Sequence, residues 1–90
     1  MEFEWNSNKA TSNLAKHDVS FQEASTVFGD PLAFTFPDPD HSHDETRYIT
    51  IGESIQGRLL IISHTDIEQQ IRIISARKLT RQERKIYEND

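Results

Sequence analysis

Toward its end the chain reads Arg72-Ile-Ile-Ser-Ala-Arg77-Lys-Leu-Thr-Arg-Gln-Glu-Arg84-Lys85. The first half of this stretch predicts a strand over about 70–77, because β-branched residues are frequent in it. The second half contains Thr80-Arg-Gln-Glu83, a capping box that predicts a helix over about 81–88. Six basic residues and one acid lie in the stretch, and clustered guanidinium groups are typical of phosphate or nucleic-acid contact.

The first third of the chain predicts one short strand and two helices. Phe3-Glu4-Trp5 alternates apolar and polar residues, as strands do. Asn6 is a suitable N-cap for a helix over about 7–17. A second helix begins at the capping box Ser20-Phe-Gln-Glu23 and ends at Gly29-Asp-Pro31.

The middle and end of the chain change to the period of strands. Strands are predicted near 32–36, 46–53, 58–64 and 70–77. The connections between the later ones are short enough for hairpins, so we expect an antiparallel meander without parallel crossovers. The order of strand, two helices, four strands and helix is an α+β layout.

Length and composition limit the fold and the type of site. Ninety residues suit one domain, 1–90, with one modest core. The chain has no cysteine, which excludes disulfides and thiolate metal sites. No signal peptide or membrane-spanning run is evident, so a soluble, cytoplasmic protein without a membrane partner is expected.

Charge is distributed unevenly along the chain. The formal net charge is −5, yet residues 58–90 contain seven basic and five acidic residues, against three and ten in residues 1–57. The basic end can meet an anionic partner while the acidic remainder limits indiscriminate binding to nucleic acid.

One acidic segment looks like a metal site at first. Asp38-Pro-Asp-His-Ser-His-Asp-Glu45 has several potential ligands, but a calcium-loop count from Asp38 places His43 where Gly is needed and Ile49 where Glu is needed. We interpret it as a polar loop, and we expect neither a metal site nor a cofactor.

These segments together resemble the BrnT family of toxins. The resemblance rests on Phe3-Glu-Trp5, Asn13-Leu-Ala-Lys16-His17, Val19-Ser-Phe-Gln-Glu-Ala24, the 47–52 strand, His64-Thr65, Arg72-Ile-Ile-Ser-Ala-Arg77, Thr80-Arg-Gln-Glu-Arg84 and Tyr87-Glu88. It covers nearly the whole chain, and it departs from the family pattern at Asn6 and Asp18, where Asp and Gly are common.

The resemblance implies a RelE-like fold, with an antiparallel sheet, two helices before it and one after it. It also implies a ribonuclease of a bacterial type II toxin-antitoxin system, acting on RNA and held in a hetero-oligomer by a cognate antitoxin. In this family the antitoxin is usually a ribbon-helix-helix protein. The alternative is a non-catalytic RNA- or protein-binding module on the same fold.

Arginines are the first candidates for the site. Cleavage of RNA without a metal needs a base for the 2′-hydroxyl, cations for the scissile phosphate and an acid for the leaving oxygen. Arg72 and Arg77 lie at opposite parity on one strand, so a strand without a bulge sends them to opposite faces. Arg77 is preferred because the end of a strand is more accessible than its middle.

Three other residues are candidates for proton transfer. His64 ends a strand and titrates near neutrality by residue type, although a histidine there is often only a hydrogen-bonding structural residue. Glu83 and Tyr87 are one helical turn apart and share a side of the last helix, with Tyr87 expected to face inward beside Ile86. Capping alone explains Glu83, and core packing alone explains Tyr87.

The remaining candidates are cations for RNA binding. Arg81, Arg84 and Lys85 give the last helix a basic face that suits an RNA backbone, as it also suits plain exposure to solvent. Lys16 lies at the end of the first helix, where a cation favours the helix dipole, and the resemblance alone implies an RNA contact for it.

Overall fold

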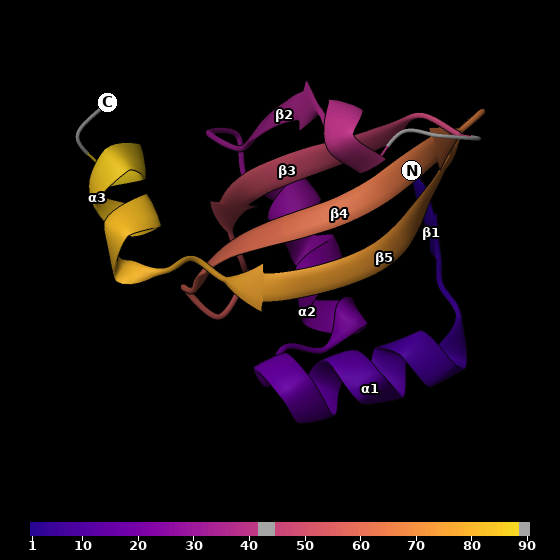
Figure 1. The fold of residues 1–90 in the computed structure, drawn as a ribbon, viewed down its shortest axis with the longest axis horizontal. Coiled ribbons are helices and arrows are strands. Elements are labelled where there is room, and N and C mark those ends of the chain that lie inside the picture. Colours follow the sequence, from indigo (N-terminus) through magenta and orange to yellow (C-terminus); the bar gives the residue numbers. More distant parts are fainter. Residues whose placement is uncertain (42–44, 89–90) are drawn as a thin grey trace.

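A five-stranded sheet is the frame of the fold (Figure 1). The computed structural model describes residues 1–41 and 45–88. In chain order the elements are β1 (Glu2–Glu4), α1 (Ser7–His17), α2 (Phe21–Thr26), the 3-10 helix η1 (Val27–Gly29), β2 (Phe34–Pro37), the 3-10 helix η2 (Pro39–His41), β3 (Arg47–Glu53), β4 (Leu59–Ile67), β5 (Gln70–Lys78) and α3 (Arg81–Glu88). The order confirms the predicted α+β layout.

The sheet is mixed rather than purely antiparallel. Its strands are arranged β1-β5-β4-β3-β2, and the four later strands form the predicted antiparallel meander. The expectation of no parallel pairing was wrong, because β1 pairs in parallel with β5, with Glu2 opposite Gln70 and Glu4 opposite Arg72. Almost the whole chain lies between these two strands, which leaves ample length for a parallel crossover.

A β-bulge in β5 sets the direction of its side chains. Ser63 of β4 lies opposite Ser75, but the next residue, His64, lies opposite Ile73, so Ile74 is an extra residue on β5. The extra residue reverses the alternation, and Arg72 and Arg77 therefore point to the same face of the sheet. The sequence had predicted opposite faces for these arginines unless a bulge intervened.

The two faces of the sheet differ in what covers them. One face packs against α2, η1 and the chain leading into α2, and its core residues are Val19, Phe21, Ala24, Val27, Leu60, Ile62, Ile71, Ile73 and Ala76. The other face turns toward the viewer in Figure 1, with α2 behind the sheet and α1 below β5. We call it the open face, and register places Arg72, Ser75 and Arg77 on it, opposite Thr65, Ser63 and Ile61.

Helix α1 is joined to β5 by a buried asparagine. The N-cap Asn6 is as predicted, accepting a hydrogen bond from the Lys9 amide at 3.0 Å. The apolar Leu14 is 50% exposed, whereas the polar Asn13 is only 7% exposed. The Asn13 amide group accepts from the Ala76 N–H at 3.1 Å and donates to the Ala76 carbonyl at 2.8 Å and the Val19 carbonyl at 3.0 Å.

The turn after α1 contains a left-handed residue. Asp18 has φ 58° and ψ 34° and closes the helix by donating its N–H to the Leu14 carbonyl. Gly is the usual residue in this conformation because it lacks a Cβ. The aspartate that departs from the family pattern therefore lies where glycine is favoured.

Helix α3 follows the end of β5 and reaches across to β2 (Figure 1). Its capping box is confirmed: Thr80 Oγ1 accepts from the Glu83 N–H at 3.1 Å, and the Glu83 carboxylate accepts from the Thr80 N–H at 2.8 Å. Tyr87 packs inward on Phe34, with ring centroids 5.8 Å apart. The expectation that Ile86 also faces inward was wrong, because it is 63% exposed.

The predictions of a polar loop and of no membrane-spanning segment concern the remaining parts of the chain. Part of the predicted polar loop, residues 42–44, lies outside the described residues. Among the described helices, none is both long and apolar enough to cross a membrane.

Replacing Asn13 with alanine should lower the free energy of unfolding by roughly 2–3 kcal/mol, because the buried backbone groups of Ala76 lose their partner. Urea unfolding measures the change. Asn8→Ala is the matched control, since Asn8 is an exposed asparagine on the same helix and should change stability little. An equal loss in both variants would contradict the role assigned to Asn13.

Candidate functional site

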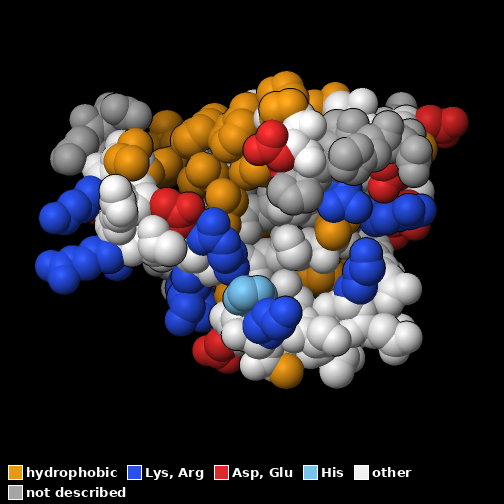
Figure 2. All heavy atoms as spheres, in the orientation of Figure 1, with side chains coloured by type: hydrophobic (Ala, Val, Ile, Leu, Met, Phe, Trp, Pro, Cys, Tyr) orange, Lys and Arg blue, Asp and Glu red, His pale blue; other side chains and the backbone are white. Residues whose placement is uncertain are grey.

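The open face has an apolar half and a polar half. Register places Phe34 and Phe36 beside Ile51 and Ile49, and the two phenylalanines are 47% and 38% exposed. In Figure 2 hydrophobic side chains gather over β2 and β3, while lysines and arginines surround the lower part of the same face. The polar half, on β4 and β5, holds Ser63, Ser75, Arg72 and Arg77.

Arg77 is held in a fixed orientation by α3. Its Nη1 donates to Glu83 Oε1 at 2.8 Å and to the Lys78 carbonyl at 3.2 Å, and its Nη2 donates to Glu83 Oε2 at 3.1 Å. This is a two-pronged arginine–carboxylate pair, in which the planar fork gives geometric specificity. The Arg77 side chain remains 40% exposed on the open face. Sequence analysis paired neither residue with the other.

The same pair determines the ionisation of Glu83. Hydrogen bonds from the Arg77 guanidinium, followed by the Thr80 backbone N–H, lower the pKa of Glu83 to about 2. Its partner Arg77 has a raised pKa, chiefly through the hydrogen bond to Glu83. Glu83 is therefore a carboxylate at neutral pH and a weak base.

Arg72 lies on the open face but apart from Arg77. Its Nε is 3.8 Å from Glu4 Oε1 on β1, and its side chain is 47% exposed. Their partners on β4, Thr65 and Ile61, are four residues apart, which is about 13 Å at the usual rise per residue. The two arginines share a face and can contact different phosphates of one strand, but they cannot clamp a single phosphate.

His64, the candidate acid or base at the end of its strand, lies in the core. It is 1% exposed, on the face opposite the two arginines. Its Nε2 is 2.7 Å from Thr50 Oγ1, its Nδ1 is 2.8 Å from Asp66 Oδ1, and its ring packs edge-on against Phe28. Burial lowers the pKa of His64, although the hydrogen bond to Asp66 opposes this. A buried, doubly bonded imidazole fits the structural alternative.

Tyr87 shares a side of α3 with Glu83 but contacts the apolar half. Its ring stacks on Phe34 with an interplanar angle of 15°. Burial, and then the carboxylates of Asp30 and Glu53, raise the pKa of Tyr87. The phenol is thus protonated at neutral pH, and it anchors α3 to β2.

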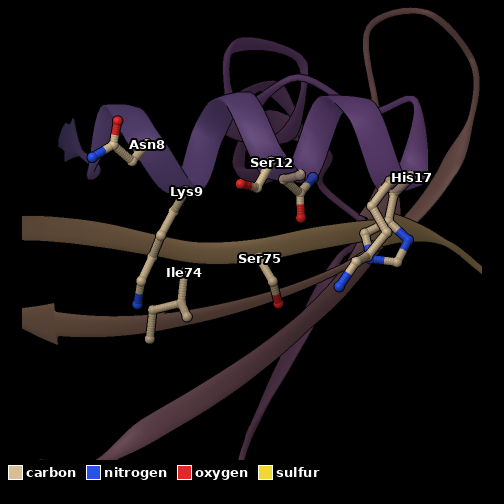
Figure 3. Close-up of a pocket in the computed structure, with 8 residues that line it drawn as sticks. Asn8, Lys9, Ser12, His17, Ile74 and Ser75 are labelled. Carbon is tan, nitrogen blue, oxygen red and sulfur yellow. The ribbon is translucent and has the colours of Figure 1, made fainter.

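Lys16 lies in a groove between α1 and β5, shown in Figure 3. The groove has a volume of about 290 Å³, and we call it the α1–β5 groove. Its lining residues are Asn8, Lys9, Ser12, Asn13, Lys16, His17, Ile74 and Ser75. Lys9, Ser12 and Ser75 were missed by sequence analysis. For the helical members the signal was present, because Lys9, Ser12 and Lys16 repeat at three- and four-residue spacing and so share one side of α1.

The three cations of α3 are exposed, as expected. Arg81, Arg84 and Lys85 have no ion pair among the described residues. Arg84 lines a second groove of about 350 Å³, which also contains Glu53 and Glu88. This second groove is therefore lined by both basic and acidic side chains.

Metal ligands do not gather in the part of the chain that the structure describes. Among residues 1–41 and 45–88, no three His, Asp or Glu side chains lie close enough to hold an ion together. The histidines and acids of the segment after Asp38 lie partly within residues 42–44, which are outside the described residues.

Comparison with known proteins gives a family and a fold. Residues 5–83 match the family described as the ribonuclease toxin BrnT of type II toxin-antitoxin systems. No curated protein matches the sequence significantly. The crystal structure of the Brucella abortus ribonuclease toxin BrnT superposes with a TM-score of 0.70 over 90% of this chain and 99% of that chain, at 21% identity, which supports the fold.

The match spans most of the chain, from the residue after β1 through α1, α2 and β2 to β5, and it ends at the start of α3. A type II toxin-antitoxin family of ribonucleases has an RNA target and an antitoxin partner. The match favours the catalytic reading over the non-catalytic binding module. This chain belongs to the BrnT family, the ribonuclease toxins of type II toxin-antitoxin systems.

Proposed function

We propose that this ribonuclease cleaves RNA on the polar half of its open face, beside Arg77, without a metal ion. The 2′-hydroxyl of the substrate attacks the adjacent phosphorus, and the bond from phosphorus to the 5′-oxygen breaks as the new bond forms. The observation that carries the proposal is Arg77 itself, an exposed guanidinium held rigidly by a bidentate carboxylate. A preorganised cation stabilises the charge that develops on the phosphate oxygens.

Arg77 retains donors for that phosphate. A guanidinium has five N–H groups, and three are used in the bonds to Glu83 and the Lys78 carbonyl. Two N–H groups remain for phosphate oxygens. Because arginine stays protonated throughout the physiological range, this contact does not depend on pH.

Glu83 acts in this proposal as the positioning residue for Arg77. Its depressed pKa makes it a poor base near neutrality, so we do not assign it the proton of the 2′-hydroxyl. Tyr87 anchors α3, which carries Glu83, through its stacking on Phe34. His64 is left out of the reacting centre because it is buried on the other face.

The other cations guide the RNA. We infer that Arg72 contacts a phosphate distant from the scissile one, since it lies about 13 Å from Arg77 on the same face. Lys16 contributes from α1, and Arg81, Arg84 and Lys85 contribute long-range attraction from α3. Phosphate contacts of this kind position a nucleic acid without reading its sequence.

We propose that the antitoxin is a ribbon-helix-helix protein and that it covers the apolar half of the open face in a hetero-oligomer in the cytoplasm. Phe34 and Phe36 are large apolar side chains left exposed there, and patches of this kind mark protein interfaces. In Figure 2 both acidic and basic side chains lie around the patch, so an antitoxin segment with an apolar centre and charged residues of both signs at its edges fits it.

Arg77→Ala should reduce cleavage of single-stranded RNA about 100-fold or more and abolish growth arrest on induced expression. Arg81→Ala, an exposed arginine without an ion pair, should change the rate only a few-fold. A folded Arg77→Ala protein with full toxicity would remove Arg77 from the site. If the unmodified chain neither cleaved RNA nor arrested growth, the non-catalytic module would be favoured instead.

Glu83→Gln should lower kcat while leaving RNA affinity equal or higher, because Arg77 loses its orientation while the site loses one negative charge. In the unmodified enzyme, the ion pair contributes fully above the ordinary carboxyl pKa and is lost only as pH falls through about 2. No titration of Glu83 should therefore appear in the rate between neutrality and mild acid. A limb of the pH–rate profile that disappears in Glu83→Gln would identify Glu83 as an acid or base.

Phe36→Ala should weaken antitoxin binding about tenfold or more, since large aromatic residues in interface centres dominate affinity. RNA cleavage by the free toxin should stay unchanged. Ile55→Ala is the control, because Ile55 is 81% exposed in the β3–β4 turn, away from the patch. Titration of labelled antitoxin gives the affinities, and equal affinity for both variants would place the interface elsewhere.

A further inference from the structure

The α1–β5 groove combines two lysines and a histidine with the hydroxyl groups of two serines. Lys9, Lys16 and His17 line it, and no ion pair joins any of them to a carboxylate of the described residues. Ser12 and Ser75 contribute hydroxyls. Among residues 1–41 and 45–88, no carboxylate lines the groove. In a chain of net charge −5, such a cavity is a local site of positive potential.

We propose that the α1–β5 groove is a phosphate-binding subsite that holds the backbone of single-stranded RNA next to the reacting phosphate. The inference rests on the proposed function and extends it, because it assigns Lys9, His17 and the two serines to substrate binding. Ammonium groups bind phosphate as compact point charges, and hydroxyl groups donate to phosphate oxygens.

The groove is arranged along the direction of β5. Figure 3 shows Lys9 beside Ile74 at one end, Ser12 above Ser75 in the middle and His17 at the other end. Asn13 bonds to Ala76, so the last turn of α1 lies next to the residue that precedes Arg77. A chain of phosphates following the groove would thus arrive at Arg77.

The β-bulge places a residue of the groove, Ser75, on the same face of the sheet as Arg77. Because Ile74 is the extra residue, Ser75 and Arg77 both point to the open face. They are two residues apart, about 7 Å along the strand. Without the bulge, both side chains would point into the core and the groove would lack its hydroxyl floor.

Neighbouring grooves lack this chemistry. The groove beside α3 contains Glu53 and Glu88 with its cations, and the one beside β1 contains Glu4 with Lys9 and Arg72. Carboxylates repel a phosphodiester, so these grooves suit anions less well. The α1–β5 groove is therefore the better anion site of the three.

The test measures binding separately from cleavage. A fluorescent single-stranded oligoribonucleotide with 2′-O-methyl groups cannot be cleaved by 2′-hydroxyl attack, and its anisotropy reports affinity at several salt concentrations. Lys9→Gln and Lys16→Gln should each raise Kd about fivefold to tenfold and reduce the salt slope by about 0.7. Lys16→Arg should stay close to the unmodified protein, because the charge is kept.

Lys78→Gln is the matched control, since it removes one exposed lysine and the same charge outside the groove. Equal losses for Lys78→Gln and the groove variants would overturn the proposal, as would failure of the unmodified protein to bind the oligonucleotide. A loss of antitoxin affinity with unchanged RNA affinity would assign the groove to the protein partner and also overturn it. Failure of the proposed cleavage shows separately, as intact binding without cleavage of the unmethylated RNA.

Discussion

The single extra residue in β5 is the feature on which the proposed site depends. Ile74 has no partner on β4, so the alternation of side chains reverses between Ile73 and Ser75. Ala76 then turns to the core, and its backbone meets the Asn13 amide of α1. Arg77 turns to the open face, where α3 can reach it through Glu83. The bulge therefore sets the side-chain directions that place α1, the α1–β5 groove and Arg77 next to one another.

The open face separates two functions by chemistry. Its apolar half, with Phe34 and Phe36 exposed, suits a protein partner, whereas its polar half suits a polyanion. Basic residues are not all available to RNA: Arg58 is committed to Glu23, with its Nε 2.9 Å from Glu23 Oε2, and this pair joins the β3–β4 hairpin to α2. The binding surface is therefore smaller than the count of lysines and arginines indicates.

Parts of the candidate site could be predicted from the spacing of residues a few positions apart in the sequence. The Thr80–Glu83 box was predicted and is present, because a capping box depends on residues three apart. His64 shares parity with Leu60 and Ile62, which already indicated the core face, yet residue type favoured a catalytic role for it. Pairing of Arg77 with Glu83 was not predicted, since it requires the strand and helix to meet at a particular angle.

The sequence by itself determined the order of elements, the caps of its helices and the antiparallel meander, because these depend on neighbours within a few residues. Only the tertiary structure decided the parallel pairing of β1 with β5, the burial of Asn13 and the bulge at Ile74. Asn13 and Ala76 are 63 residues apart, and no local pattern encodes which backbone groups a distant amide will satisfy. The cost of leaving a buried backbone group unpaired selects that contact, and it acts only once the chain has folded.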